Sequence, residues 1–261
     1  MDTRDPITAD ALARLYDLDL ADDPGDLDLY LALAARADGD VLELAVGSGR
    51  LAVPLAAAGH RVTGVDIDPA MLARARERAR RAGVAEPALA LVEADLLGLT
   101  LPTAGTFGLA FVALNSLMLL GSRDRQRAAV RVLAEHLAPG GLAVVDVWLP
   151  DAEDLARFDG RVILEWTRTD EATGAVVTKL GSAQHDAATA VVSLTTVFEE
   201  GRQGSSADRW VRHDRLRLVT ADELQGFADE AGLRTELMAG GYDLSPLGPG
   251  SERAILVAVR P

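Results

Sequence analysis

The chain has 261 residues, of which 49% are hydrophobic and 25% charged, proportions of a folded globular protein rather than of a disordered one. This length allows one large α/β domain or two small ones, and we expect one. The net charge of −14 disfavours nucleic acid and anionic lipid as partners, because an acidic surface repels them. The absence of cysteine excludes disulfides, thiolate metal sites and a cysteine nucleophile.

The N-terminal segment gives no targeting signal. Residues 1–30 carry acidic side chains throughout and lack the apolar stretch of a secretory signal peptide. No run of 18 apolar residues occurs, so we expect no membrane span. A cytoplasmic protein without a membrane or nucleic-acid partner is therefore expected.

Short apolar runs alternate with helical patterns across residues 39–148, which is typical of a parallel sheet built from βαβ units. The expected strands span residues 41–46, 62–67, 89–93, 109–114 and 142–148. The expected helices span residues 50–58, 69–82 and 124–137, the last ending before Pro139-Gly140-Gly141.

Beyond Trp148 the pattern changes to alternation with period two across residues 161–219, with turn sequences at 173–174 and 201–204. This predicts an antiparallel β insertion after the fifth strand, on the substrate side of the site or in the contact of a homodimer. A helix at 221–231 and strands near 235–238 and at 254–259 complete the core sheet. The expected division is 1–38 for N-terminal helices, 39–150 for the core, 160–219 for the insertion and 220–261 for the end of the core.

The first strand runs into a glycine-rich turn. Residues 41–50 read Val-Leu-Glu-Leu-Ala-Val-Gly-Ser-Gly-Arg, a buried strand and a turn that opens a helix. Glycines at 47 and 49 let the backbone approach a ligand closely, and the helix N-terminus offers free N–H groups to an anionic group. Taken alone, the segment also fits an ordinary tight turn between strand and helix.

Acidic residues follow the next two strands. Asp66 ends the second strand about 20 residues after Gly47, where it can accept hydrogen bonds from both hydroxyls of an adenosine ribose. Asp95 and Leu96 follow the third strand, where a carboxylate can bind an exocyclic amine and leucine can cover a purine. Because the carboxyl ends of parallel strands meet at one edge of the sheet, these positions predict a nucleotide-like ligand.

A dinucleotide-binding protein is the main rival, since residues 47–52 also satisfy the G-x-G-x-x-G/A fingerprint. A short-chain dehydrogenase needs Tyr-x-x-x-Lys, yet the only lysine, Lys179, is preceded by Ala175 at the tyrosine position. A short-chain dehydrogenase is therefore excluded. A Rossmann protein with another hydride-transfer site stays open, although Asp95 and the terminal strand pair disfavour it.

Four motifs, in chain order, resemble class I S-adenosylmethionine-dependent methyltransferases. They are Glu43-Leu-Ala45-Val-Gly47-Ser-Gly49-Arg50, Gly64-Val-Asp66-Ile-Asp68, Glu93-Ala-Asp95-Leu96 and Leu137-Ala-Pro139-Gly140-Gly141. The resemblance implies a doubly wound α/β fold with a seven-stranded Rossmann-like sheet, S-adenosylmethionine as cofactor and S-adenosylhomocysteine as product. Ala45 departs from the family's pattern, which usually has its first glycine there.

The resemblance also implies roles for single residues. Gly47 and Gly49 would face the methionine part of the cofactor, Asp66 the ribose, and Asp95 with Leu96 the adenine. The further candidates for cofactor binding are Glu43, expected to brace the glycine turn from behind, and Ala45, Ser48, Ile67, Met71, Asn115 and Tyr30.

Candidate substrate-side residues lie near the ends of strands four and five and in the N-terminal helices. By the resemblance Asn115-Ser116 lies near the methionine part of the cofactor, with a helix-capping pair as the alternative. Asp146 and Trp148 alternate along the fifth strand and point to the same side of it, with a core position for Trp148 as the alternative. Tyr16 and Tyr30 lie in a segment that resembles the lid helices of small-molecule N- and O-methyltransferases, with ordinary helix docking as the alternative.

His213 is the best candidate for a general base, because histidine side chains ordinarily titrate near neutrality. It shares a strand face with Val211 and Arg215, so a solvated face is the alternative reading. No cluster of histidine and acidic residues has metal-ligand spacing, so no metal is expected. The candidate catalytic residues are His213, Asp146, Trp148 and Tyr16, with Glu165 or solvent as other proton acceptors.

Together these patterns predict methyl transfer to the nitrogen or oxygen of a small molecule, such as an aminosugar, an amino-acid-like compound or another specialised metabolite. Positioning is expected to dominate catalysis, since oriented reactions gain roughly 7–11 kcal/mol. Two alternatives stay open, because a fold does not fix a reaction. One is a different reaction of the same cofactor, such as hydrolysis or cyclisation, and the other is a non-catalytic scaffold.

Overall fold

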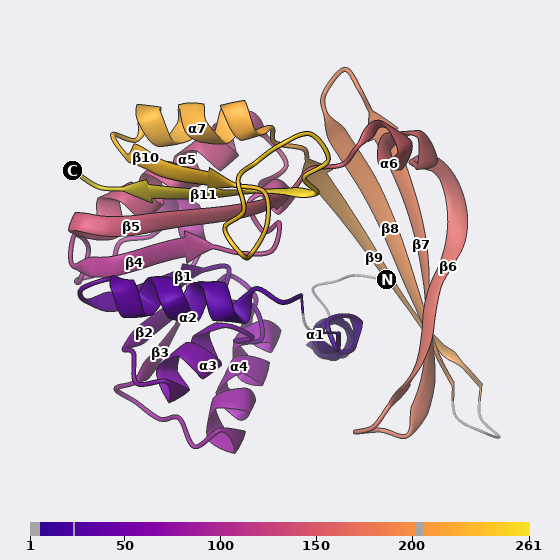
Figure 1. Ribbon diagram of the computed structural model, residues 1–261. Helices are drawn as coiled ribbons and strands as arrows, with labels where there is room; N and C mark the ends of the chain where they lie inside the picture. The colour runs from indigo at the N-terminus through magenta and orange to yellow at the C-terminus, as the bar shows by residue number, and fades with distance from the viewer. Residues whose placement is uncertain (1–5, 23, 202–205) are drawn as a thin grey trace.

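The computed structural model describes residues 6–22, 24–201 and 206–261, which form two sheets with helices around them (Figure 1). The larger sheet has seven strands in the order β10-β11-β5-β4-β1-β2-β3. Its strands are β1 (Asp40–Leu44), β2 (Val62–Asp66), β3 (Leu89–Glu93), β4 (Phe107–Val112), β5 (Leu137–Trp148), β10 (Arg234–Ala239) and β11 (Arg253–Val259).

Strands β1 to β5 run parallel, whereas β11 pairs antiparallel with both β5 and β10. Helices cover both faces of this sheet, so its central strands are buried on both sides; all six residues of β4 are buried. The helices are α1 (Pro6–Asp19), α2 (Leu27–Arg36), α3 (Ala52–Ala57), α4 (Pro69–Arg81), α5 (Arg123–His136), α6 (Ala152–Arg157) and α7 (Ala221–Glu230), with short 3₁₀ helices η1 (Leu96–Gly98) and η2 (Met118–Leu120).

Two hydrophobic layers hold the helices to the sheet. Leu133 of α5 and Phe227 of α7 pack on one face, and Leu33 of α2, Leu55 of α3 and Leu72 of α4 pack on the other. No helix in the described part of the chain is long and apolar enough to cross a membrane. The strand order and the helices packed on both faces of the larger sheet confirm the doubly wound seven-stranded fold expected from the sequence.

Strands β1 and β4 end two residues earlier than the sequence pattern predicts, and β2 ends one residue earlier. Strand β1 ends at Leu44 because Ala45 turns into the left-handed region with φ of 58°. Strand β4 ends at Val112, and Leu114 and Asn115 follow with φ of 49° and 65°. Both strands therefore end in sharp turns at the carboxyl edge of the sheet.

The fifth strand differs most from the prediction. Residues 137–141 were expected to end a helix and form a turn, but β5 already begins at Leu137. The reason is a long-range partner, because the Gly140 N–H donates to the Arg260 carbonyl at 2.7 Å and the Arg260 N–H donates to the Gly141 carbonyl at 2.9 Å. The end of the chain thus extends the strand backwards.

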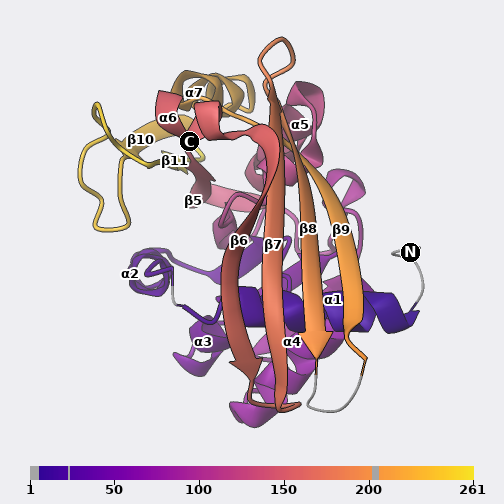
Figure 2. The same cartoon turned by 90° about the vertical axis from the view of Figure 1, so that its right-hand side faces the viewer.

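The smaller sheet is the antiparallel insertion after β5. Its strands β6 (Asp159–Asp170), β7 (Ala175–Asp186), β8 (Val191–Gly201) and β9 (Asp208–Arg217) pair in chain order. It stands beside the core, with α1 between the two (Figures 1 and 2). Leu15 of α1 packs on Val177 and Phe198 of this sheet. Of the turn expected at 201–204, only Gly201 belongs to the described residues. The turn at 187–190, between β7 and β8, was not predicted from the sequence.

Candidate functional site

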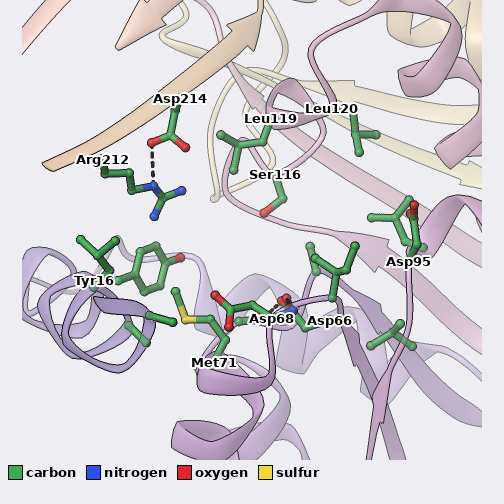
Figure 3. Close-up of a pocket in the computed structure, with 18 of the residues that line it drawn as sticks. Tyr16, Asp66, Asp68, Met71, Asp95, Ser116, Leu119, Leu120, Arg212 and Asp214 are labelled. Atoms are coloured by element: carbon green, nitrogen blue, oxygen red, sulfur yellow. Dashed lines mark hydrogen bonds and ion pairs between the residues drawn. The ribbon is translucent and has the colours of Figure 1, made fainter. Parts of the chain in front are cut away.

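A cavity of about 490 Å³ lies at the carboxyl ends of β1, β2 and β3, which is within the usual size range of ligand sites. Helix α1 forms its roof and β9 one wall, while η2 and the start of α5 close another side (Figure 3). Its floor is formed by Ala45, Gly47, Asp66, Ile67, Asp68, Met71, Asp95 and Leu96. Seven of the candidates for cofactor binding thus border one cavity.

The two glycines of the turn have different surroundings. Gly47 has φ of 55°, and a Cβ added there would meet only Tyr16 Cε1, at 4.0 Å, so that its backbone is open towards the cavity. A Cβ at Gly49 would lie 3.1 Å from both Ala75 and Val53. Gly49 therefore lets the turn pack closely on α3 and α4, and unlike Gly47 it is not among the residues that border the cavity.

Asp66 lies on the cavity floor and fixes the local backbone. Its Oδ2 accepts a hydrogen bond from the Gly47 N–H at 2.7 Å, and its Oδ1 accepts one from the Asp68 N–H at 2.9 Å. Burial raises the pKa of Asp66 even though these two N–H groups favour the charged form. The carboxylate is thus held at the end of β2, with hydrogen-bond acceptor capacity left for a ligand hydroxyl.

An apolar slot occupies the other end of the cavity. The side chains of Ile67 and Leu119 are 66% and 46% exposed, although both border the cavity. Asp95 caps η1 by accepting a hydrogen bond from the Leu97 N–H at 3.0 Å through one oxygen, which leaves its second oxygen available. Two apolar surfaces beside a carboxylate fit a flat ring that carries an amino group, such as adenine.

Other candidates lie behind the cavity. Glu43 is 4% exposed, its Oε2 has no hydrogen-bond partner among the described residues, and burial raises its pKa well above the usual value. The hydroxyl of Ser48, also buried, donates to Asp17 on α1. Tyr30 packs on Phe111 with ring centroids 4.4 Å apart and does not border the cavity. The structure thus places Tyr30 in the core, as ordinary helix docking would.

The candidates from β4 and β5 support the end of the sheet instead of lining the cavity. Asp146 is fully buried, pairs with Arg253, and accepts hydrogen bonds from the Tyr242 hydroxyl at 2.9 Å and the Leu114 N–H at 3.2 Å. The Asn115 side chain accepts a hydrogen bond from the Trp148 backbone N–H. Trp148 itself stacks edge-on against Phe158. These contacts hold in place the turn that carries Ser116, which does border the cavity.

The wall formed by β9 carries two cavity-facing residues, Arg212 and Asp214, that the sequence analysis did not single out. Arg212 and Asp214 of β9 point into the cavity, and Arg212 Nε lies 2.7 Å from Asp214 Oδ2 (Figure 3). His213, the candidate general base, also borders the cavity, but successive side chains of a strand point to opposite faces, so its imidazole lies on the other face from Arg212 and Asp214. That side chain is exposed, and its Nδ1 is 3.1 Å from the Thr195 hydroxyl. Period-two alternation separates the two faces, but the sequence alone does not say which one meets the core.

Comparison with known proteins agrees with this geometry. Residues 41–141 match the model of a methyltransferase domain family. The cypemycin N-terminal methyltransferase of a Streptomyces species is 28% identical over 221 residues, which cover 84% of this chain and 82% of that protein. The structure of the CcbJ methyltransferase from Streptomyces caelestis is similar with a TM-score of 0.77 and 26% identity, covering 92% of this chain and 98% of that one. Residues 41–141 therefore form a methyltransferase domain, and the chain as a whole is similar to S-adenosylmethionine-dependent methyltransferases.

The fold of the methyltransferase also matches, at a TM-score of 0.78 and 19% identity, that of an S-adenosylmethionine-dependent methyltransferase from Clostridium acetobutylicum, covering 96% of this chain and 98% of that one. The residues present fit the cofactor, because the open backbone at Gly47, the carboxylate of Asp66 and the slot beside Ile67 follow one another along the floor. In this fit Gly47 would face the methionine part, Asp66 the ribose, and Ile67, Asp95 and Leu96 the adenine. Bound there, S-adenosylmethionine supplies an activated methyl group on a sulfonium.

Proposed function

We propose that the methyltransferase methylates a nitrogen atom of a small molecule. The acceptor has to fit beside the cofactor in a cavity that is roofed by α1 and walled by β9. Such an enclosure admits a small molecule or a free chain end, whereas a duplex or a folded surface would be held outside. The net charge of −14 favours cationic amines and disfavours polyanions in the same way.

The observation that carries the choice of nitrogen is the chemistry of the wall around the acceptor. Burial raises the pKa of Tyr16, so its hydroxyl stays protonated near neutral pH. The carboxylate of Asp214 is paired with Arg212, and His213, although it borders the cavity, contacts Thr195 through Nδ1 on the opposite face of β9. These described side chains offer no strong base for an alcohol, whereas an amine that arrives as a cation can release its proton to solvent and then attack the methyl group through its lone pair.

Each residue of the wall then has a positioning role. The carboxylate of Asp214 accepts a hydrogen bond from the acceptor amine, and Arg212 holds that carboxylate in place. Tyr16 and Ser116 offer hydroxyl groups from the roof and from the turn after β4. The name of the cypemycin N-terminal methyltransferase, which refers to an amino terminus, supports the same acceptor class. An aminosugar, an amino-acid-like compound or a peptide N-terminus fits these demands.

Matched acceptors test this proposal. The protein is incubated with S-adenosylmethionine and with pairs of compounds that differ only in an amine or hydroxyl group, such as aminosugars with their parent sugars and peptides with free or acetylated N-termini. Mass spectrometry should find one or more added methyl groups on the compounds with a free amine and none on the matched hydroxyl or acetylated compounds. Transfer to the hydroxyl compounds, or to acetylated peptides as readily as to free ones, would overturn the assignment.

A further inference from the structure

Asp17 on α1 joins three parts of the methyltransferase at one carboxylate. Its Oδ1 accepts a hydrogen bond from the hydroxyl of Ser48, which lies between the two glycines of the turn. Its Oδ2 accepts one from Arg74 Nε at 2.6 Å, and Oδ1 accepts another from Arg78 at 3.0 Å, both arginines belonging to α4. The residue before it, Tyr16, borders the cavity. One side chain thus connects the roof, the glycine turn and α4.

Neighbouring charged residues of α1 point the other way. Asp19 accepts hydrogen bonds from Trp166 Nε1 at 2.8 Å and from Lys179 Nζ at 2.7 Å, both in the smaller sheet. Arg14 pairs with Asp170 and Glu200 of the same sheet. Helix α1 therefore stays attached to the smaller sheet through these contacts even if Asp17 releases the core.

The roof lies directly over the ligand positions. Ala9, Leu12, Ala13 and Tyr16 of α1 border the cavity whose floor includes Gly47 and Asp66. A cofactor bound on that floor lies next to α1, so movement of the helix away from the glycine turn would widen the path by which product leaves and fresh cofactor enters. The Asp17 contacts are among those that have to break in this movement.

We propose that Asp17 is a positioning residue that latches α1 onto the glycine turn and so couples cofactor retention to closure of the roof. Because Ser48 is 1% exposed and lies in the turn that faces the cofactor, anything that fixes this turn also fixes the partner of Asp17. By linkage, a ligand that stabilises the turn strengthens the latch to the same extent that the latch strengthens ligand binding. The proposal does not depend on which acceptor is methylated.

The test compares two substitutions on the same helix. Asp17→Asn removes the charge from the latch, whereas Asp19→Asn removes the corresponding charge from the contact with the smaller sheet and serves as the matched control. The measurements are the dissociation rate of S-adenosylhomocysteine, followed by stopped flow, and amide hydrogen exchange of α1 in the complex. Thermal unfolding of both variants reports any general loss of stability.

Asp17→Asn should speed dissociation by about tenfold to a hundredfold, the range for losing charge-assisted hydrogen bonds, and should increase exchange in α1. Ser48→Ala, which leaves the ion pairs intact, should give a smaller change in the same direction. Higher ionic strength should speed dissociation from the wild type more than from Asp17→Asn, because the latch charges are partly exposed. Equal effects of Asp17→Asn and Asp19→Asn, or an unchanged rate in Asp17→Asn and Ser48→Ala, would overturn the latch.

Discussion

Replacing Gly47 by alanine should separate cofactor binding from folding. The added Cβ meets only Tyr16 Cε1, at 4.0 Å, so the substitution causes no clash inside the protein. Its folding cost comes from φ of 55°, where a non-glycine residue loses roughly 1–2 kcal/mol. Ala45 already adopts φ of 58° in the same turn, which shows that alanine is tolerated in this conformation. For a chain of this size the melting temperature should fall by roughly 2–8 °C.

The effect on the cofactor should be larger than the effect on folding. The new methyl group projects from the backbone that faces the methionine part, so the cofactor has to move away and lose hydrogen bonds to the turn. Losing one charge-assisted bond costs about 1.5–3 kcal/mol, which corresponds to a roughly tenfold to hundredfold weaker affinity. Calorimetric titration with S-adenosylhomocysteine measures this loss.

Gly49→Ala is the control for Gly47→Ala. Its Cβ would lie 3.1 Å from Ala75 and Val53, and φ is 76°, so overpacking of about 1–3 kcal/mol adds to the backbone cost. We expect a lower melting temperature than for Gly47→Ala but a smaller loss of affinity. If Gly47→Ala binds S-adenosylhomocysteine as the wild type does, or if Gly49→Ala loses more affinity, the assignment of the two glycines is wrong.

Three further predictions concern single side chains. Asp66→Ala should weaken binding of S-adenosylhomocysteine by about tenfold to a hundredfold in a calorimetric titration, the range for losing a charge-assisted bond to the ribose, and unchanged affinity would remove Asp66 from the site. His213→Ala should keep turnover within about threefold of the wild type with an unchanged pH profile, whereas a loss of 10²-fold to 10⁴-fold would restore the histidine as general base. Burial raises the pKa of Glu43, so the folded protein retains a proton on this side chain that the unfolded chain releases. The contribution of the protonated Glu43 to the free energy of unfolding is therefore complete below the usual glutamate pKa, and it is lost as pH rises towards the raised pKa. Glu43→Gln should therefore lose less stability than the wild type between about pH 5 and pH 8 in urea titrations, and parallel curves would contradict the raised pKa.

The sequence predicts the floor of the cavity well because its residues are local in the chain. Gly47, Asp66 and Asp95 each follow a strand of one parallel sheet, so strand order alone brings them to the same edge. Arg212 and Asp214 were missed because their position depends on how α1 packs the smaller sheet against the core, which no local pattern reports.

The role of Asp146 could not be predicted from the strand pattern. Alternation with Trp148 along the fifth strand correctly groups residues by side, but it does not identify their partners. The carboxylate is neutralised by Arg253 and hydrogen-bonded by Tyr242, both about 100 residues away in sequence. Whether a buried acid serves catalysis or structure is thus decided by long-range contacts.

The two halves of the cavity belong to different stretches of the chain. The cofactor floor comes from residues 45–96, whereas Arg212 and Asp214 belong to an excursion that leaves the core after β5 and returns before α7. If Arg212 and Asp214 contact the acceptor as proposed, donor and acceptor recognition are encoded in separate stretches of the chain. Substitutions on the cavity face of β9 would then redirect the enzyme to a new acceptor while the residues of the cofactor floor stay unchanged, which makes this segment the natural unit for engineering acceptor choice.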